Sequence, residues 1–233
     1  MIGAKSLLDS LMGQVGNLTQ GQGAAGLGGK AKEAWTAQSG LGKGAIAGGL
    51  MGVLMAGGGS KMLGKGVQIG GAALIGGLAY KAYEDWKAGK AATPEPGPIA
   101  LPKPDGTAFL PSDPMQANDL SARLLQAMVA AAKADGHVTQ AERMRIDTQL
   151  ATLGLGAEAH AMITAELDTP LDAGRIAALA RNEEEATEIY AASLLTVDPN
   201  GAAEKGYLAM LAARLNLHPG LVDHLHAKAA QLT

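Results

Sequence analysis

Apolar positions recur at helical spacing along most of the chain, and their surroundings divide it into four segments. In the first segment, residues 1–40, an apolar face and a polar face alternate with the period of a helix. Leu7, Leu8, Leu11, Val15 and Leu18 form the apolar face, opposite Lys5, Asp9, Ser10 and Gln14. We expect an amphipathic helix, which would lie along a membrane surface or pack on its own protein. The rest of the segment, rich in Gly, Gln and Ala, is typical of a flexible connector.

The second segment, residues 41–90, contains two uncharged runs, Gly44 to Ser60 and Gly66 to Tyr80, which Lys61 and Lys65 separate. As helices the runs would be roughly 25 and 23 Å long at about 1.5 Å per residue, somewhat short of a hydrocarbon core of about 30 Å. Small residues recur at every fourth position and would form a smooth stripe on a helix. The stripe comprises Gly40, Gly44, Gly48, Gly52 and Ala56, then Gly66 and Gly70, with Ala72, Gly76, Ala73 and Gly77 repeating the spacing.

Such a stripe lets helix backbones approach closely, which is how helices associate in lipid. We therefore predict a glycine-zipper helical hairpin that anchors the chain in a membrane and joins it to other copies. The alternative is a glycine-rich helical pair buried in a soluble oligomer. Aromatic and basic residues beyond the second run are typical of the membrane interface: Tyr80, Tyr83 and Trp86, with Lys81 and Lys87. Lysines on both outer flanks favour cytoplasmic termini, although Lys61 and Lys65 at the tip weaken this orientation.

The third segment, residues 91–114, holds seven of the ten prolines. Proline lacks the amide donor that helices and sheets require, so we expect a semi-extended linker and a domain boundary here. The fourth segment, residues 115–233, is predicted to be a multi-helix bundle, with a first apolar stripe at Leu120, Leu124, Leu125, Met128, Val129 and Ala132. Within this bundle we predict two similar helix-turn-helix units. Asp135 lies at the turn of the first unit and Asp198 at the turn of the second, and Glu142 and Glu204 lie near the start of the helix that follows each turn.

Composition supports an all-α fold with two electrostatically different halves. Aromatic residues make up 3% of the chain and there is no cysteine, so neither a disulfide nor a thiolate site can form. Residues 1–93 carry nine Lys and Arg against four Asp and Glu, whereas residues 94–233 carry 10 against 18. A basic, glycine-rich half favours contact with anionic lipid, and an acidic half argues against nucleic acid as a partner.

Two stretches resemble a known family. "AAKADGHVTQAER" and "NEEEATEIYAASLLTVDPNGAAEKGYLAMLAARLNL" resemble the TerB-like domain, named after tellurite resistance protein B. With the glycine-rich segment and proline-rich linker ahead of it, the chain resembles the bacterial inner-membrane proteins of domain-of-unknown-function family 533. The resemblance implies an all-helical bundle, a role in membrane-linked stress responses and suspected metal binding. It implies no established activity.

Acidic residues at the two turns are the candidate metal ligands. Asp135, Glu142, Asp198 and Glu204 would form an oxygen-rich site for Ca²⁺ or Mg²⁺ if the two units pack face to face. Each also has a purely structural explanation, since Asp135 suits a turn, Glu142 a capping box, and the stretch from Asp198 to Gly201 a type I turn. Of the histidines, His137 beside the first turn is the one we expect as a ligand.

A second acidic group, Glu183, Glu184 and Glu185 with Glu188 nearby, is typical of a solvated helix face. Docking of a basic partner is the functional alternative. We find no catalytic triad, phosphate loop or dinucleotide motif and expect no enzyme activity; a hydrolase with a carboxylate-bound metal would need a water-activating group that is not evident.

Two functions therefore stay open. The first is a non-enzymatic, membrane-anchored, self-associating scaffold of the bacterial inner membrane, whose N-terminus and acidic helical domain are cytoplasmic. The second is a sensor that binds a divalent metal at the paired acidic turns.

Overall fold

The computed structural model describes residues 4–6, 8, 9, 71–93, 101–134, 144, 157–197 and 201–232. These residues form an all-helical arrangement, and an isolated antiparallel bridge between Thr107 and Leu110 is the one sheet-like pairing among them. The all-α prediction is confirmed for this part of the chain. The helices are α4 (Gly71–Lys87), α5 (Pro114–Ala132), α7 (Ala157–Asp168), α8 (Ala173–Ala177), α9 (Glu183–Leu194), α10 (Ala202–Arg214) and α11 (Pro219–Ala229).

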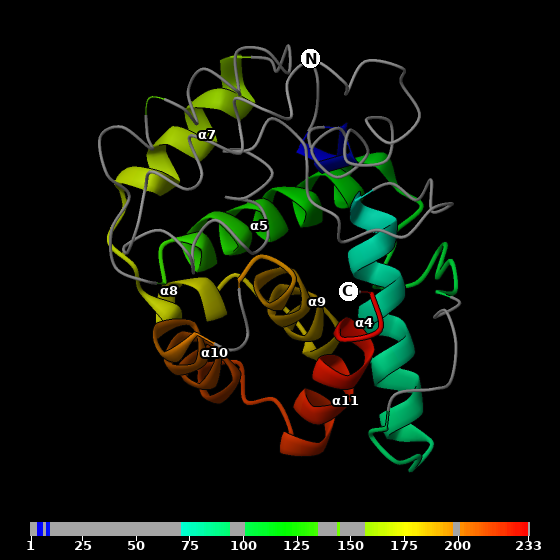
Figure 1. Ribbon diagram of the computed structural model, residues 1–233. Helices are drawn as coiled ribbons and strands as arrows, with labels where there is room; N and C mark the ends of the chain where they lie inside the picture. The colour runs from blue at the N-terminus through cyan, green and yellow to red at the C-terminus, as the bar shows by residue number, and fades with distance from the viewer. Residues whose placement is uncertain are drawn as a thin grey trace, which may run out of the picture.

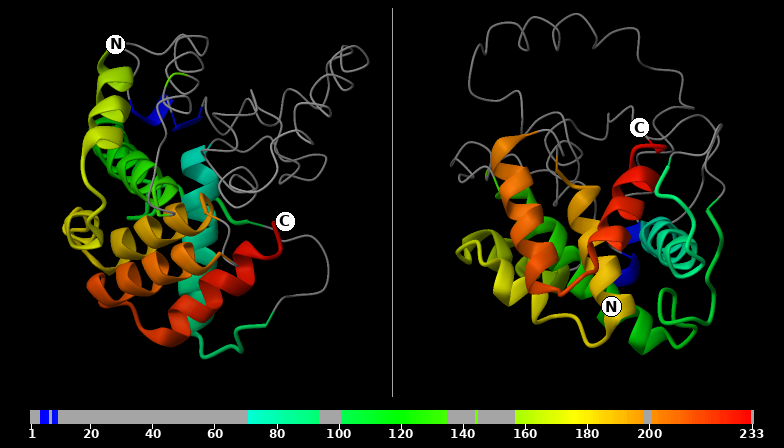
Figure 2. Two further views of the ribbon diagram at one scale, coloured as in Figure 1. Left: turned by 60° about the vertical axis from the view of Figure 1, so that its left-hand side comes forward. Right: turned by 90° about the horizontal axis from the view of Figure 1, so that it is seen from below.

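Helix α9 is the central element, and its neighbours surround it (Figure 1). It packs against α5, α4, α10 and α11, while α8 packs on α10. Every residue from Glu185 to Leu194 is buried, because the run from Ala186 to Leu194 has small or apolar residues on every face and a single charge, and such a helix is covered on all sides. The two further views show α11 beside α4 on one flank of α9 and α10 on the other (Figure 2).

Helix α5 follows the predicted apolar stripe. Asp113 begins the helix, since its side chain accepts a hydrogen bond of 2.9 Å from the amide of Gln116, and Pro114 occupies the first turn, where no amide donor is needed. Leu124, Leu125 and Met128 are at most 1% exposed. The prediction for this helix is confirmed.

Helix α4 differs from the predicted second arm of the hairpin. Its apolar residues Ile75, Leu78, Ala79 and Ala82 are fully buried, and the helix packs on α11 and α9. Residues 71–87 thus share the core of the C-terminal helices, although the predicted domain boundary separated them. Within the described residues, no helix combines the length and the apolar character needed to cross a membrane.

The glycines of α4 meet the proline-rich segment. A β-carbon at Gly76 would lie 2.5 Å from the carbonyl oxygen of Phe109, and one at Gly77 would lie 2.8 Å from that of Pro102. Only glycine permits this approach. The expected linker therefore folds back along α4 over its residues 101–113, and its Phe109 ring packs edge-on against Tyr80 with a centroid distance of 5.6 Å. The aromatic residues predicted as membrane anchors pack on the protein here.

The described N-terminal residues, 4–6, 8 and 9, also pack on the protein. Leu8 is fully buried in the common core. Asp9 accepts a hydrogen bond of 3.2 Å from the amide of Ala72, in the first turn of α4, and Asn118 accepts one of 3.3 Å from the amide of Lys5. Of the two alternatives for this segment, packing on its own protein describes these residues.

Candidate functional site

The predicted metal ligands lie mostly outside the described residues. Asp135, Glu142, Asp198 and the candidate His137 all do, so the Ca²⁺ or Mg²⁺ site stays a prediction. Glu204 is 8% exposed in the first turn of α10, where its carboxylate lies over Gly201. An acidic side chain there stabilises the helix N-terminus. Across the part of the chain that the structure describes, no three Asp, Glu or His side chains gather as a metal site would require.

The predicted helix-packing stripe also lies outside the described residues: Gly40, Gly44, Gly48, Gly52, Ala56, Gly66 and Gly70. The glycine-zipper interaction therefore stays a prediction. Two glycines that repeat the spacing in α4, Gly76 and Gly77, contact residues 101–113 of the same chain.

The predicted docking glutamates begin α9, and they have unlike surroundings. Asn182 precedes the helix and accepts a hydrogen bond of 2.7 Å from the amide of Glu185. The Glu185 carboxylate in turn accepts one of 2.9 Å from the amide of Arg181, in the manner of a capping box displaced by one residue. Glu185 is 9% exposed, so a docking partner would reach Glu183 and Glu184 but not Glu185.

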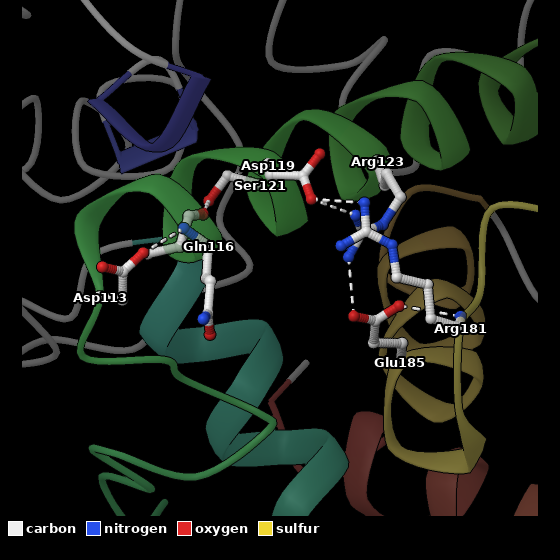
Figure 3. Close-up of polar contacts among 8 residues, drawn as sticks. Asp113, Gln116, Asp119, Ser121, Arg123, Arg181 and Glu185 are labelled. Atoms are coloured by element: carbon white, nitrogen blue, oxygen red, sulfur yellow. Dashed lines mark hydrogen bonds and ion pairs between the residues drawn. The ribbon is translucent and has the colours of Figure 1, made fainter.

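An ion-pair network joins this end of α9 to α5 (Figure 3), with buried Arg123 and Glu185 on one side and the exposed side chains of Asp119 and Arg181 on the other. Arg123, 7% exposed, donates to Glu185 at 2.8 Å and to Asp119 at 2.6 Å. Arg181 reaches Asp119 at 2.6 Å from the other side. Asp119 has its pKa lowered, because the two guanidinium groups outweigh the opposing effect of burial. The network fixes the start of α9 against α5.

Glu183 makes a more exposed contact with α4. The hydroxyl of Tyr83 donates to its carboxylate at 2.9 Å, and the ammonium of Lys87 lies 3.6 Å away. Lys87 also lies over the rings of Tyr83 and Trp86, at 5.0 and 5.2 Å from their centroids. Burial, with the nearby Glu183 carboxylate, raises the pKa of the Tyr83 phenol against the opposing hydrogen bond with Lys87. Both members of the Glu183–Lys87 pair are about half exposed, so the pair contributes little to stability.

One turn after Glu185, the carboxyl of Glu188 is isolated in the core. The residue is fully buried, and neither carboxyl oxygen has a hydrogen-bond partner. A β-carbon at Gly76 would lie 3.3 Å from one of these oxygens, so the carboxyl faces α4. Burial raises its pKa well above the ordinary value, the Glu185 charge adds to this, and Arg123 opposes it. The physical reason is that an apolar environment disfavours the ionised form.

A small cavity lies beside Glu188. Its volume is about 10 Å³, close to what one water molecule needs. Ala72 of α4, Ser121 of α5, Phe109 of the folded-back segment and Lys5 of the N-terminal segment line it together with Glu188. Four parts of the chain that are distant in sequence therefore meet at this carboxyl.

A second buried carboxyl on α4 has the opposite environment. Asp85, 3% exposed, contacts three ammonium groups: Lys81 at 2.8 Å, Lys90 at 2.7 Å and Lys228 of α11 at 3.1 Å. Burial would raise its pKa, but the hydrogen bonds from Lys81, Lys90 and Lys228 outweigh burial and hold the pKa of Asp85 far below the ordinary value. Lys228 is itself 3% exposed, so the pair fastens α11 to α4 from inside.

Sequence reasoning missed both buried carboxyls. Glu188 was expected on a solvated face with its three neighbours, whereas it is fully buried. The signal that could have found it is the apolar run from Ala186 to Leu194, in which it is the one charged residue. Asp85 carried a weaker signal, the lysine four residues before it at the spacing of a helical ion pair.

Comparison with known proteins gives a family match. The model of the family described as "Protein of unknown function (DUF533)" matches residues 40–229. A relative from Yersinia enterocolitica, "Uncharacterized protein in ampR 5'region", is 35% identical over 101 residues, which cover 43% of this chain and 73% of the relative. No solved structure matches the chain. The family match takes in the glycine-rich residues from position 40 together with the helical domain.

Proposed function

The chain belongs to the DUF533 family, and from that premise we propose that it is a non-enzymatic, membrane-anchored interaction module. Its glycine-rich segment would associate with other copies at the bacterial inner membrane, and its TerB-like helical domain would face the cytoplasm. Two glutamates at the start of α9, the exposed Glu183 and the partly exposed Glu184, would meet a basic protein partner there.

The observation that carries this proposal is the place of α4 in the fold. This helix begins at Gly71, directly after the glycine-rich residues 40–70, and its apolar face is buried in the core of the helical domain. The predicted proline-rich linker therefore does not lie between the glycine-rich residues and the core, because α4 comes before it in the chain. In such a protein the anchor would determine where the surface of the helical domain is held, which suits a scaffold.

The position of α4 also defines how the anchor would enter lipid. With residues 71–87 packed in the domain, the second uncharged run keeps only residues 66–70 for the hairpin, which as a helix would be about 7.5 Å long at 1.5 Å per residue. A hydrocarbon core is about 30 Å thick. We therefore favour a re-entrant insertion, in which the segment enters and leaves the bilayer on the same side.

Alkaline carbonate extraction of membranes from cells that produce the full chain tests the anchor. The wild-type protein is expected in the membrane pellet. A Leu54→Asp variant should move to the supernatant, because a carboxylate near the middle of a membrane segment costs about 2.5 to 3.5 kcal/mol. Gln20→Asp, which adds the same charge outside the uncharged runs, is the matched control and should stay in the pellet. Wild-type protein in the supernatant would remove the anchor from the proposal.

Self-association has a direct test because the chain has no cysteine. A single cysteine at position 52, on the predicted stripe, should form a disulfide-linked dimer under mild oxidation in membranes. A cysteine at the neighbouring position 53, turned by about 100° around the helix, is the control and should form far less. Equal cross-linking at Gly52→Cys and Val53→Cys would contradict a specific glycine interface.

A further inference from the structure

We propose that Glu188 is a buried proton-binding site that latches α4 onto α9, so that loss of its proton loosens α4 and the segments packed on it. The proposal is independent of membrane association, since it concerns contacts among the described helices. It extends the proposed function by giving the junction between the glycine-rich segment and the helical domain a chemical control.

The first argument is that the closed structure has no place for a negative charge at Glu188. The side chain has no contact with solvent, because it is fully buried. Both of its carboxyl oxygens also lack a hydrogen-bond donor. An ionised carboxylate under these conditions loses its hydration without compensation. A protonated carboxyl loses much less, and it can donate its hydrogen to a water in the adjoining cavity of about 10 Å³.

The second argument is that the nearby cations are already used. On α5, Arg123 is the cation that faces Glu188, and its guanidinium is bound to Glu185 and Asp119. In the N-terminal segment, Lys5 lines the cavity, and its ammonium donates to Asp9 at 2.7 Å. Glu185, on the same helix face, adds a negative charge.

The third argument is the position of the carboxyl between elements. On the α4 side it faces Gly76 and Ala72, and on the side of residues 107–111 it faces Phe109, Leu110 and Pro111, none of which carries a charge. An ionised Glu188 would need water, and water that replaces these apolar contacts would supply it. The proton it releases would leave to solvent as water replaces the apolar contacts. Opening therefore separates α4 and residues 101–113 from α9.

The sign of the pH dependence follows from where the proton is held. The closed state binds the proton more tightly than the open state, whose carboxyl titrates near its ordinary pKa of 4.5. Above that pH the open state has lost the proton while the closed state keeps it. Opening of α4 should therefore become about tenfold more favourable for each pH unit until the pKa of the closed state is reached. Below pH 4.5 the dependence should vanish.

Amide hydrogen exchange of residues 74–82 in the full chain measures this opening, with each rate divided by the intrinsic rate at the same pH. The wild type should show the tenfold rise per pH unit. Glu188→Gln, which mimics the protonated carboxyl, should show no dependence in this range. Glu184→Gln removes the same charge from the same helix near its exposed end and should follow the wild type. If the glutamine variant does not fold, Glu188→Met serves in its place, with the same expectation.

Infrared spectroscopy of the full chain gives a second readout that needs no opening. A protonated carboxyl band should persist in the wild type at pH values where the exposed glutamates are ionised, and Glu188→Gln or Glu188→Met should lack it. The proposal is overturned if the wild-type exchange is independent of pH, if the Glu188 variants keep the wild-type slope, or if no such band is lost. Carbonate extraction can fail without affecting any of these outcomes.

Discussion

Two buried carboxyls hold α4 in opposite ways. Asp85 points from α4 toward α11 and is surrounded by three lysine ammonium groups. Glu188 points from α9 toward α4 and has none within hydrogen-bonding distance. Both are nearly or completely removed from solvent, so burial alone does not distinguish them. The difference lies in the partners, which lower the pKa of Asp85 and leave burial to raise that of Glu188.

The comparison shows that one helix can have a permanent contact and a conditional one. The lowered pKa of Asp85 keeps its carboxylate ionised near neutrality, and this side gives α4 a fixed attachment to α11. The Glu188 side depends on a proton. We expect α4 to loosen first from α9, while its contact with α11 persists.

The largest effect is expected from Asp85→Asn. The substitution would remove the carboxylate that the buried ammonium of Lys228 contacts at 3.1 Å, and breaking a buried pair from one side costs about 3 to 5 kcal/mol. Urea unfolding followed by circular dichroism measures the loss of unfolding free energy. Glu84→Gln removes a charge from the adjacent, exposed position and should change it by less than about 0.5 kcal/mol. Equal effects at both positions would show that Asp85 does not hold α4.

The same variant should change the response to acid. Because the folded pKa of Asp85 lies below its ordinary value of 3.8, its contribution is complete above that pH and is lost as the pH falls from 3.8 toward the folded value. Stability measured between pH 5 and pH 2 should fall less steeply in Asp85→Asn than in the wild type. Parallel curves would contradict the assignment. Asp85 therefore predicts a loss of stability as the pH falls, whereas Glu188 predicts more frequent opening of α4 as the pH rises.

A smaller effect is expected from Gly76→Ala, which tests the contact between α4 and residues 101–113. The added methyl group would collide with the Phe109 carbonyl, and such overpacking costs about 1 to 3 kcal/mol. Gly206→Ala in α10 is the control, since a β-carbon there meets nothing within 4 Å. It should stabilise the protein by about 0.5 to 1 kcal/mol, the helical advantage of alanine. Thermal unfolding of both variants measures the contrast, and a stabilised Gly76→Ala would contradict the contact.

The smallest effect is expected from Tyr83→Phe. It removes the hydrogen bond to Glu183 at the rim of the α4–α9 contact, where both partners reach water. The expected loss is no more than about 0.5 to 1 kcal/mol, measured by urea unfolding. A loss of unfolding free energy similar to that of Asp85→Asn would mean that the exposed hydrogen bond stabilises the position of α4 as much as the buried ion pair does.

The sequence predicted the helical class and the stripe of α5, because apolar periodicity reports directly on which face of a helix is buried. It could not predict where α4 belongs. A glycine-rich apolar run looks the same whether it will meet lipid or a protein core, since both environments are dry and both reward close approach. The decisive fact is the partner of Gly76 and Gly77, which lies about 30 residues away in sequence and has no local signal.

The acidic start of α9 illustrates a second limit. The three consecutive glutamates were assigned together to the surface, but a helix turns by about 100° per residue, so that adjacent residues face different surroundings. Glu183 remains exposed, while Glu185 and Glu188 face α5 and the core. A run of like charges therefore defines a helix end more reliably than it defines a docking surface. Locating the counter-charge Arg123, 62 positions from Glu185, required the tertiary structure.

The contact of Gly76 and Gly77 with residues 101–113 has a consequence for stoichiometry. A helix surface that is already filled by its own chain cannot accept the same surface of a neighbouring copy. If copies associate through the predicted stripe, as we propose, the contact would use its members before residue 71, and the spacing of the helical domains would follow from that contact.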